Sequence, residues 1–230
     1  MFQGFSKTGF QFLKELKENN AKEWFEERRD IYEQSLRNPS KSLIEDMDQV
    51  FLQEALPFEA SLKKSLFRIH RDTRFSKDKS PYKTNIGITF PVIREGMSKE
   101  AKTEIPGIYL HIEPNACFVA GGLYMPDANQ LKSLRARIEE DWEILNELNH
   151  NPEFLKEFPE GLHGNKLKTM PRGFDPEHPG KEYLRMKQFI VMSFIPDEIT
   201  QSEKLIQLLT KKAKSMAPIM MYLEESVREY

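Results

Sequence analysis

The sequence predicts an α+β fold, in which an antiparallel sheet of hairpins is flanked by N-terminal and C-terminal helices. Apolar residues recur at helical spacing in the first third of the chain and again after residue 127, whereas the middle alternates apolar and polar residues. The alternating segments follow one another too closely for the crossover helices that parallel strands require. No repeat or linker divides the 230 residues, so we expect a single domain over residues 1–230.

Three amphipathic helices are predicted in the N-terminal third. Apolar side chains lie at helical spacing over residues 10–16, 24–32 and 43–51. Residues at which a helix commonly begins precede the first and third of these runs. These predicted starts are Ser6 or Thr8, and Asn38 as an N-cap followed by Pro39.

The middle of the chain predicts two hairpins. Phe67 and Ile69 share one face of the first strand, and the second strand covers residues 86–90. Residues 108–112 alternate again, and the turn at 113–116 leads into another strand that ends near Tyr124.

Helix returns after the hairpins. Asp127 is a good N-cap for a long helix, and Asn151 followed by proline begins a shorter one. Residues 166–179 read as a loop because of their prolines and glycine. Residues 189–195 are nearly all apolar, which predicts a strand covered on both faces, and the C-terminal helices that follow are expected to be interrupted at Pro218.

Charge and cysteine content restrict the classes of function. Lys and Arg total 34 against 36 Asp and Glu, a net charge of −2, so a nucleic-acid role would need a local basic patch. The single cysteine, Cys117, excludes an internal disulfide framework and fits a reducing compartment; it lies in an apolar strand, where a core role is expected. No apolar run is long enough to span a bilayer. We therefore expect a cytoplasmic protein that does not associate with membranes.

The densest charged stretch is the segment 68–83, which we call the basic hairpin. It holds six Arg and Lys residues against Asp72 and Asp78. Arginine forks bind phosphate or carboxylate bidentately, and lysine adds a point charge, so the segment favours an anionic small molecule as ligand. Arg71 is in phase with Phe67 and Ile69, where an apolar residue is expected, so it needs a partner near Asp72 or from a distant glutamate.

The leading hypothesis is an anion pocket at the basic hairpin. Asp72 is expected to stay ionised and orient the ligand, and Tyr82, beside several cations, to become a more acidic proton donor. A second basic loop is expected to converge on this site. Whether the ligand is turned over stays open, and neither a metal nor a cofactor is assigned. The proposed ligand-binding residues are Arg68, Arg71, Arg74, Lys79, Lys83, Lys168 and Arg172.

Four alternatives compete with this hypothesis. The charged residues of a solvated hairpin can simply pair with each other. The same hairpin can follow a nucleic-acid backbone while Phe75 and Tyr82 stack on bases, or it can contact another protein. The pairs His70-x-Asp72 and His111-x-Glu113 have metal-ligand character, but the surrounding arginines repel a cation.

A family resemblance adds to this interpretation. The string R-x-x-R-D-x-R-F-x-x-D-K-x-x-Y resembles the signature of the family called domain of unknown function 2461, which consists of uncharacterised bacterial and fungal proteins. Asn115-Ala116 departs from the glycine-containing turn expected there. The resemblance implies no reaction, ligand or catalytic residue. It is carried in the hairpin by Arg68, Arg71, Asp72, Arg74, Phe75, Asp78, Lys79 and Tyr82, and elsewhere by Phe12-Leu13, Asn19-Asn20, Trp24-Phe25, Gly121-Gly122, Tyr124, Pro126, Leu167-Lys168, Pro171 to Phe174 and His178-Pro179.

Overall fold

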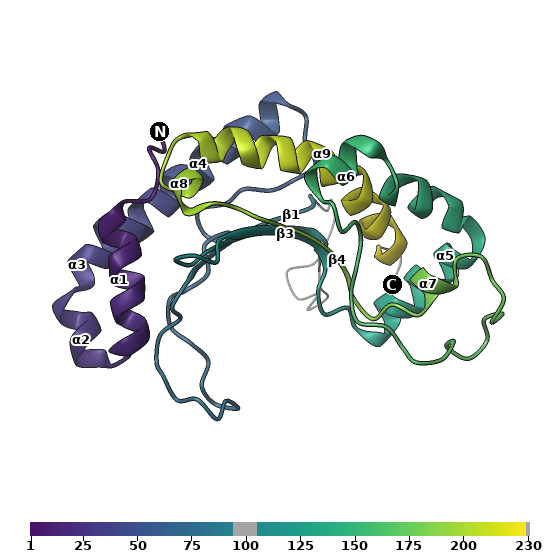
Figure 1. The fold of residues 1–230 in the computed structure, drawn as a ribbon, viewed down its shortest axis with the longest axis horizontal. Helices are drawn as coiled ribbons and strands as arrows, with labels where there is room; N and C mark the ends of the chain where they lie inside the picture. Colours follow the sequence, from purple (N-terminus) through teal and green to yellow (C-terminus); the bar gives the residue numbers. More distant parts are fainter. Residues whose placement is uncertain (94–104, 229–230) are drawn as a thin grey trace.

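A computed structural model describes residues 1–93 and 105–228 (Figure 1). Its centre is a four-stranded antiparallel sheet in the order β1-β2-β3-β4, with helices before β1, between β3 and β4, and after β4 in the sequence. The predicted α+β class and the antiparallel sheet are confirmed. The prediction of a single domain stays a prediction.

The elements follow the sequence periods. The strands are β1 (Ile86–Pro91), β2 (Gly107–Ile112), β3 (Phe118–Leu123) and β4 (Phe189–Phe194). The N-terminal helices are α1 (Lys7–Glu18), α2 (Lys22–Glu27), α3 (Arg29–Tyr32), the π-helix η1 (Glu33–Arg37) and α4 (Asn38–Gln53). The later helices are α5 (Ala128–Asn149), α6 (Pro152–Glu157), α7 (Lys181–Leu184), α8 (Asp197–Thr200) and α9 (Lys204–Val227).

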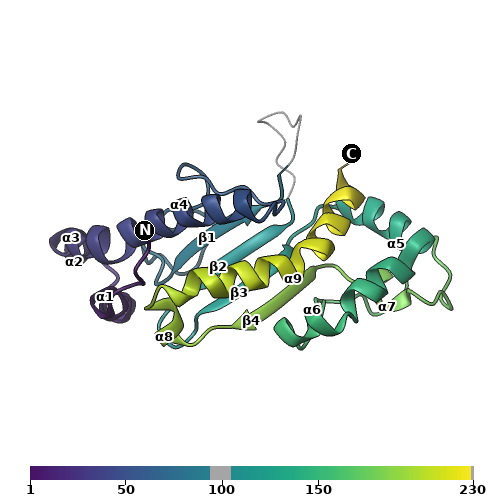
Figure 2. The same ribbon diagram turned by 90° about the horizontal axis from the view of Figure 1, so that it is seen from above.

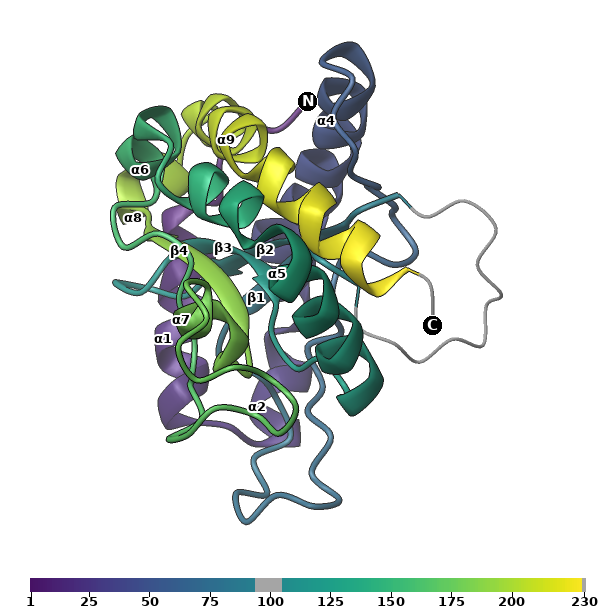
Figure 3. The same cartoon turned by 90° about the vertical axis from the view of Figure 1, so that its right-hand side faces the viewer.

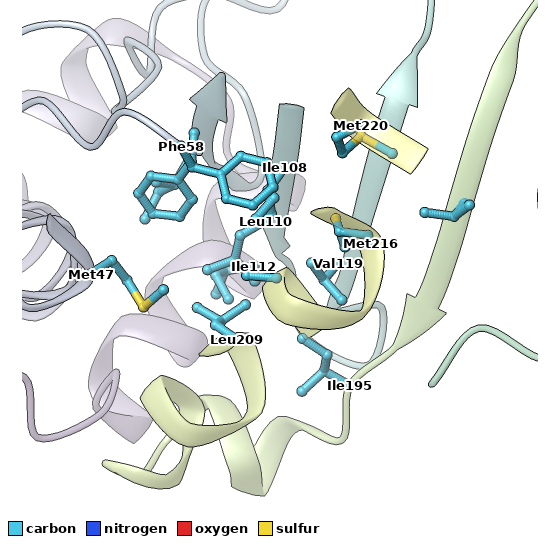
Figure 4. Close-up of a cluster of buried hydrophobic side chains, with 14 of the residues drawn as sticks. Met47, Phe58, Ile108, Leu110, Ile112, Val119, Ile195, Leu209, Met216 and Met220 are labelled. Atoms are coloured by element: carbon cyan, nitrogen blue, oxygen red, sulfur yellow. The ribbon is translucent and has the colours of Figure 1, made fainter. Parts of the chain in front are cut away.

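Helices α4 and α9 cover one face of the sheet (Figures 1 and 2). Side chains from alternate positions of the strands point toward these helices, as Figure 4 shows for Leu110, Ile112 and Val119 opposite Met47 of α4 and Met216 of α9. All five are fully buried. Removing this much apolar surface from water is the main force that holds the helices on the sheet.

The opposite face of the sheet is left uncovered by helices in the part of the chain that the structure describes. In Figure 1, α1, α2 and α3 lie to one side of this face, and α5 and α7 lie to the other. We call it the uncovered face. Its side chains are the alternate ones of each strand, and most are only half-buried, in contrast to the core side.

Several predicted helix starts are confirmed by their hydrogen bonds. The Ser6 hydroxyl accepts from the backbone N–H of Gly9 at the start of α1. Asp127 and Gln130 form a reciprocal capping box at the start of α5, and Asn151 caps α6. Each side chain satisfies a backbone donor that the first helical turn leaves free.

Three predictions about individual helices and strands are wrong. Asn38 does not cap a new helix, because η1 runs directly into α4 and its wider turn precedes Pro39, which lacks a backbone donor. Pro218 does not interrupt the last helix, since α9 continues through it to Val227. Strand β4 is not covered on both faces: it is an edge strand, and Phe194 is 70% exposed.

The predicted turn between β2 and β3 is confirmed. Asn115 takes φ 63°, the left-handed region in which glycine is usual and asparagine is tolerated. The departure from the family pattern therefore leaves the turn conformation intact. The Asn115 N–H also donates to the carboxylate of Asp197, which ties this turn to α8.

Candidate functional site

The basic hairpin projects away from the sheet on the side of α2 (Figures 1 and 3). The strand predicted around Phe67 and Ile69, which leads into it, does not form as a regular strand and pairs only through isolated bridges, Leu66 with Ile88 and His70 with Tyr82. Asn20, between α1 and α2, fixes the base of the hairpin by bonding the backbone N–H and carbonyl of Tyr82, both at 3.0 Å.

Two of the three predicted arginine clamps are paired inside the hairpin. Arg71 pairs with Asp78, and Arg74 pairs with Asp72 at 2.7 Å. The hydrogen bond from Arg74 lowers the pKa of Asp72, so the expectation that Asp72 stays ionised is confirmed. Hydrogen bonds from Ser80 and Arg71 lower the pKa of Asp78 as well. In the structure these guanidinium groups hold the hairpin together, as one of the alternatives anticipated.

The prediction of a more acidic Tyr82 is wrong. Its ring is buried and stacks on Phe25 of α2 with centroids 4.1 Å apart. Burial raises the pKa of the phenol, and the nearby Glu26 carboxylate acts in the same direction. Tyr82 thus anchors the hairpin to α2, and burial outweighs the opposite effect that the Arg29 charge has on the pKa of its phenol.

The two basic loops do not converge. In Figure 1 the basic hairpin and the loop 166–179 lie on opposite sides of the molecule. Lys168 and Arg172 are exposed on that distant loop. Lys79 is also exposed, and its ammonium donates to the carbonyl of Thr73 within the hairpin at 2.8 Å. The structure does not bring these three predicted ligands to one place.

A row of aromatic rings crosses the uncovered face. Phe67 lies 6.0 Å from Tyr109 of β2, and Tyr109 lies 5.9 Å from Phe118 of β3. Phe118 continues the row to Phe194 of β4 at 6.3 Å, and it stacks on His111 at 4.6 Å with the two planes 9° apart. The distances are centroid separations typical of aromatic pairs. We call these five residues the aromatic row.

A chain of hydrogen bonds runs along β2 within this row. Tyr109 and His111 lie two residues apart in β2, so their side chains share one face of the strand, and Glu113 follows directly after its last residue. The phenol oxygen of Tyr109 is 3.0 Å from His111 Nδ1, and His111 Nε2 is 3.1 Å from the carboxylate of Glu113. The Asn85 amide lies 3.3 Å from the same Nδ1. Because Nδ1 faces two donors and Nε2 faces a carboxylate, the imidazole accepts at Nδ1 and donates from Nε2–H.

The geometry of this series of hydrogen bonds depends on the residues around it. Burial raises the pKa of Tyr109, so its phenol stays protonated at neutral pH. Lys17 of α1 lies 3.4 Å from the Glu113 carboxylate. Across the ladder, a Cβ on Gly87 would lie 2.9 Å from the Tyr109 oxygen and 2.8 Å from the Phe67 ring, so this position needs glycine for both rings to sit as they do.

Lys83, a predicted ligand that forms no ion pair among the described residues, lies at one end of the aromatic row, and the charge of Arg68 acts on it there. The Lys83 ammonium lies 5.0 Å from the centroid of the Phe67 ring. Burial lowers the pKa of Lys83, and the positive charge of the nearby Arg68 lowers it further. Lys83 is two residues from Asn85, which contacts His111. The structure therefore joins these two cations to the hydrogen-bonded chain in one patch.

Gly121 and Gly122 serve packing. A Cβ on Gly121 would lie 2.7 Å from the sulfur of Met216 in α9. Gly122 has φ +126°, and a Cβ there would lie 1.8 Å from the Phe189 carbonyl oxygen. Their missing side chains let β3 approach α9 and β4 closely, which accounts for both glycines without a ligand.

Reasoning from the sequence missed the aromatic row. His111-x-Glu113 was noted, but only as a pair of metal ligands; within the described residues, no three His, Cys, Asp or Glu side chains come together as a metal site. The signal that was available is the alternation of Tyr109 with His111 and Glu113, which places three hydrogen-bonding side chains on one face. Cys117 is buried, and burial raises its pKa to about 11, in agreement with the expected core role.

The comparisons with known proteins identify a family and nothing further. A family described as "Conserved hypothetical protein (DUF2461)" matches residues 8–222. The chain belongs to this family. No curated protein and no solved structure matched the chain. Membership therefore confirms the resemblance seen in the sequence, and the family description assigns no activity to the aromatic row.

Within the described ranges, no helix combines the length and apolar character needed to cross a bilayer.

Proposed function

We propose that this protein binds a phosphate-bearing small molecule with a flat ring on the uncovered face. The single observation that carries the proposal is the position of the Lys83 ammonium over Phe67 at the end of the aromatic row, where it forms no ion pair with a described carboxylate and the charge of Arg68 acts on it. Flat rings stack on aromatic side chains, and Arg and Lys bind phosphate. The proposal keeps the anionic ligand inferred from the sequence but moves its site from the tip of the hairpin to the base.

The other predicted ligands take different roles in this proposal. Arg71 and Arg74 hold the hairpin through their ion pairs, and Lys168 and Arg172 lie too far away to contact the same small molecule. A reducing, cytoplasmic location remains part of the proposal on the strength of the single buried thiol.

Calorimetric titration with phenyl phosphate and inorganic phosphate tests this site. Phenyl phosphate should bind more tightly than inorganic phosphate, because only its ring can stack on the row. Lys83→Met keeps the apolar stem and removes the charge, and should weaken phenyl phosphate binding about tenfold, the effect expected for losing a charged hydrogen bond.

Lys79→Met is the matched control, since it removes a lysine charge from the tip of the same hairpin. It should leave the affinity within about twofold. Equal losses for the two variants would place the ligand at the hairpin tip. No difference between phenyl phosphate and inorganic phosphate would refute a role for the aromatic row.

A second candidate, single-stranded nucleic acid, is favoured by the extension of the row as far as Phe194, which is 70% exposed. A strand that follows the row would contact several phosphates, so its affinity would fall steeply with salt, whereas a small phosphate ester with two charge contacts would lose little. Titration of a short oligothymidylate at two salt concentrations separates the two.

A further inference from the structure

The uncovered face carries three hydrogen-bonded side chains whose arrangement ligand binding alone does not require. The Tyr109 phenol, the His111 imidazole and the Glu113 carboxylate form a linear series of hydrogen bonds at 3.0 and 3.1 Å. An activated acid–base group consists of a proton-bearing oxygen, an imidazole that accepts its proton and a carboxylate behind the imidazole.

The arrangement is held from several sides. The side chains of His111 and Glu113 are only 16% and 24% exposed, which shields their hydrogen bond from water. Phe118 stacks on the imidazole and fixes its plane, while the Asn85 amide donates to the same Nδ1 that faces Tyr109. An imidazole that is both oriented and in contact with a carboxylate is well placed to accept a proton from the phenol.

The surroundings indicate which substrate class this group would meet. Tyr109 lies in the middle of the aromatic row, next to Phe67, and Phe67 lies under the Lys83 ammonium. A ring stacked on the row with its phosphate toward Lys83 and Arg68 would bring the ester bond near the phenol. Cations beside the phosphate also stabilise the charge that builds up on its oxygens during transfer.

We propose that Tyr109, His111 and Glu113 form a proton relay that hydrolyses a phosphate ester of a flat-ring alcohol bound on the uncovered face; this rests on the proposed function. Tyr109 is the catalytic residue, His111 is the proton acceptor behind it, and Glu113 is a positioning residue.

Water loses a proton to the Tyr109 oxygen as its own oxygen bonds to phosphorus, and the phenolic proton passes to His111 Nδ1. The imidazolium so formed is stabilised by Glu113. The bond between phosphorus and the ester oxygen breaks on the side opposite the water, so the departing oxygen takes its proton from solvent, and the imidazolium returns its proton to solvent. The products are inorganic phosphate and the alcohol, and all three side chains return to their starting protonation states.

Hydrolysis of p-nitrophenyl phosphate by the purified full chain, followed by release of p-nitrophenolate, tests the relay. Tyr109→Phe and His111→Gln should each lower kcat at least 100-fold, the scale of a lost acid–base group. Both should retain phenyl phosphate binding within about threefold in calorimetry, because neither removes a cation from the site. His150→Gln, on the exposed end of α5, is the matched control and should keep full activity.

Glu113→Gln needs a readout that a structural role would not move. Its kcat for p-nitrophenyl phosphate should fall at least tenfold while KM stays within about twofold, because the carboxylate orients the imidazole and does not touch the substrate, and Glu113→Asp should recover part of kcat. A loss that lies in KM, or no recovery in Glu113→Asp, would refute the role of Glu113 in the relay.

The outcomes separate the two proposals. Phenyl phosphate binding that depends on Lys83, with no hydrolysis or with hydrolysis unaffected by Tyr109→Phe, overturns the relay and leaves the binding site standing. Absence of both binding and hydrolysis overturns both proposals. Melting curves for each variant check that folded proteins are being compared. Hydrolysis that is lost in Tyr109→Phe but kept in His150→Gln supports the relay.

Discussion

Lys212 and Glu157 form a buried ion pair where α9, α6 and β4 meet, and breaking it gives a sharp test of the packing on the face of the sheet that α9 covers. The Lys212 ammonium lies 3.1 Å from Glu157, and the two side chains are only 8% and 9% exposed. The same ammonium donates to the Ser193 hydroxyl of β4 at 2.9 Å and lies 4.9 Å from the centroid of the Phe158 ring. The pair thus connects three elements that the sequence places far apart.

Lys212→Met removes the charge and keeps most of the apolar stem. Losing one partner of a buried pair costs roughly 3–5 kcal/mol, because the other charge is left buried without compensation. Glu157 keeps a second partner here, since Lys211 lies 2.5 Å from its other oxygen. We therefore expect a loss at the low end of that range, about 3 kcal/mol in the free energy of unfolding at pH 7.

Urea unfolding followed by far-UV circular dichroism measures this loss. Lys211→Met is the matched control: it removes a charge from the same carboxylate, but the Lys211 side chain is 60% exposed, so the cost should stay below about 1 kcal/mol. Equal costs for the two variants, or a cost for Lys212→Met below about 1 kcal/mol, would refute the reasoning, because the pair would then be behaving as a solvated one.

The pH dependence of this loss has a definite sign. Burial acts to raise the pKa of Glu157, but the hydrogen bonds from Lys211 and Lys212 outweigh it and leave the pKa below the ordinary 4.5. A carboxyl group whose folded-state pKa is depressed stabilises the fold above its unfolded pKa, and this stability is lost as the pH falls through the folded value. The cost of Lys212→Met should therefore shrink when the pH is lowered from 7 to below the folded pKa of Glu157.

Two further predictions concern the uncovered face. Gly87→Ala would put a Cβ 2.8 Å from Phe67 and 2.9 Å from the Tyr109 oxygen, so the rings must move by roughly 0.5–1 Å to reach ordinary contact. A misplacement of that size should lower kcat/KM for p-nitrophenyl phosphate by about 100-fold, while the free energy of unfolding changes by less than about 1 kcal/mol; full activity would contradict the proposed role of Tyr109. The pKa of free Lys83 is lowered by burial and by Arg68, and phosphate binds its charged form, so affinity for phenyl phosphate should be full below that pKa and fall as the pH rises through it. Calorimetry from pH 7 to 10 checks this, and Lys83→Met should abolish the dependence; an equal fall in that variant would assign the titration to another group.

The candidate site was only partly predictable. The sequence located the cations, and Lys83 and Arg68 remain in the proposal, but Arg71 and Arg74 pair with carboxylates a few residues away, which leaves them no free charge. Tyr82 was expected beside cations in solvent, and it is buried against Phe25 of a different element. Ion pairing and burial depend on which segments meet, and a single run of sequence does not contain that information.

The sequence by itself determined the features that depend on residues only a few positions apart. Helix starts such as Ser6 and Asp127 and the turn at Asn115 follow from local hydrogen bonding and backbone preference. The alternation along β2 likewise places Tyr109 and His111 on one face whatever lies around them, and Glu113 follows directly after the strand. The tertiary structure decided which face of the sheet α4 and α9 would cover. Because burial is a property of the whole packed assembly, only the folded chain shows that these three side chains lie on the uncovered face, in one row with Phe67, Phe118 and Phe194.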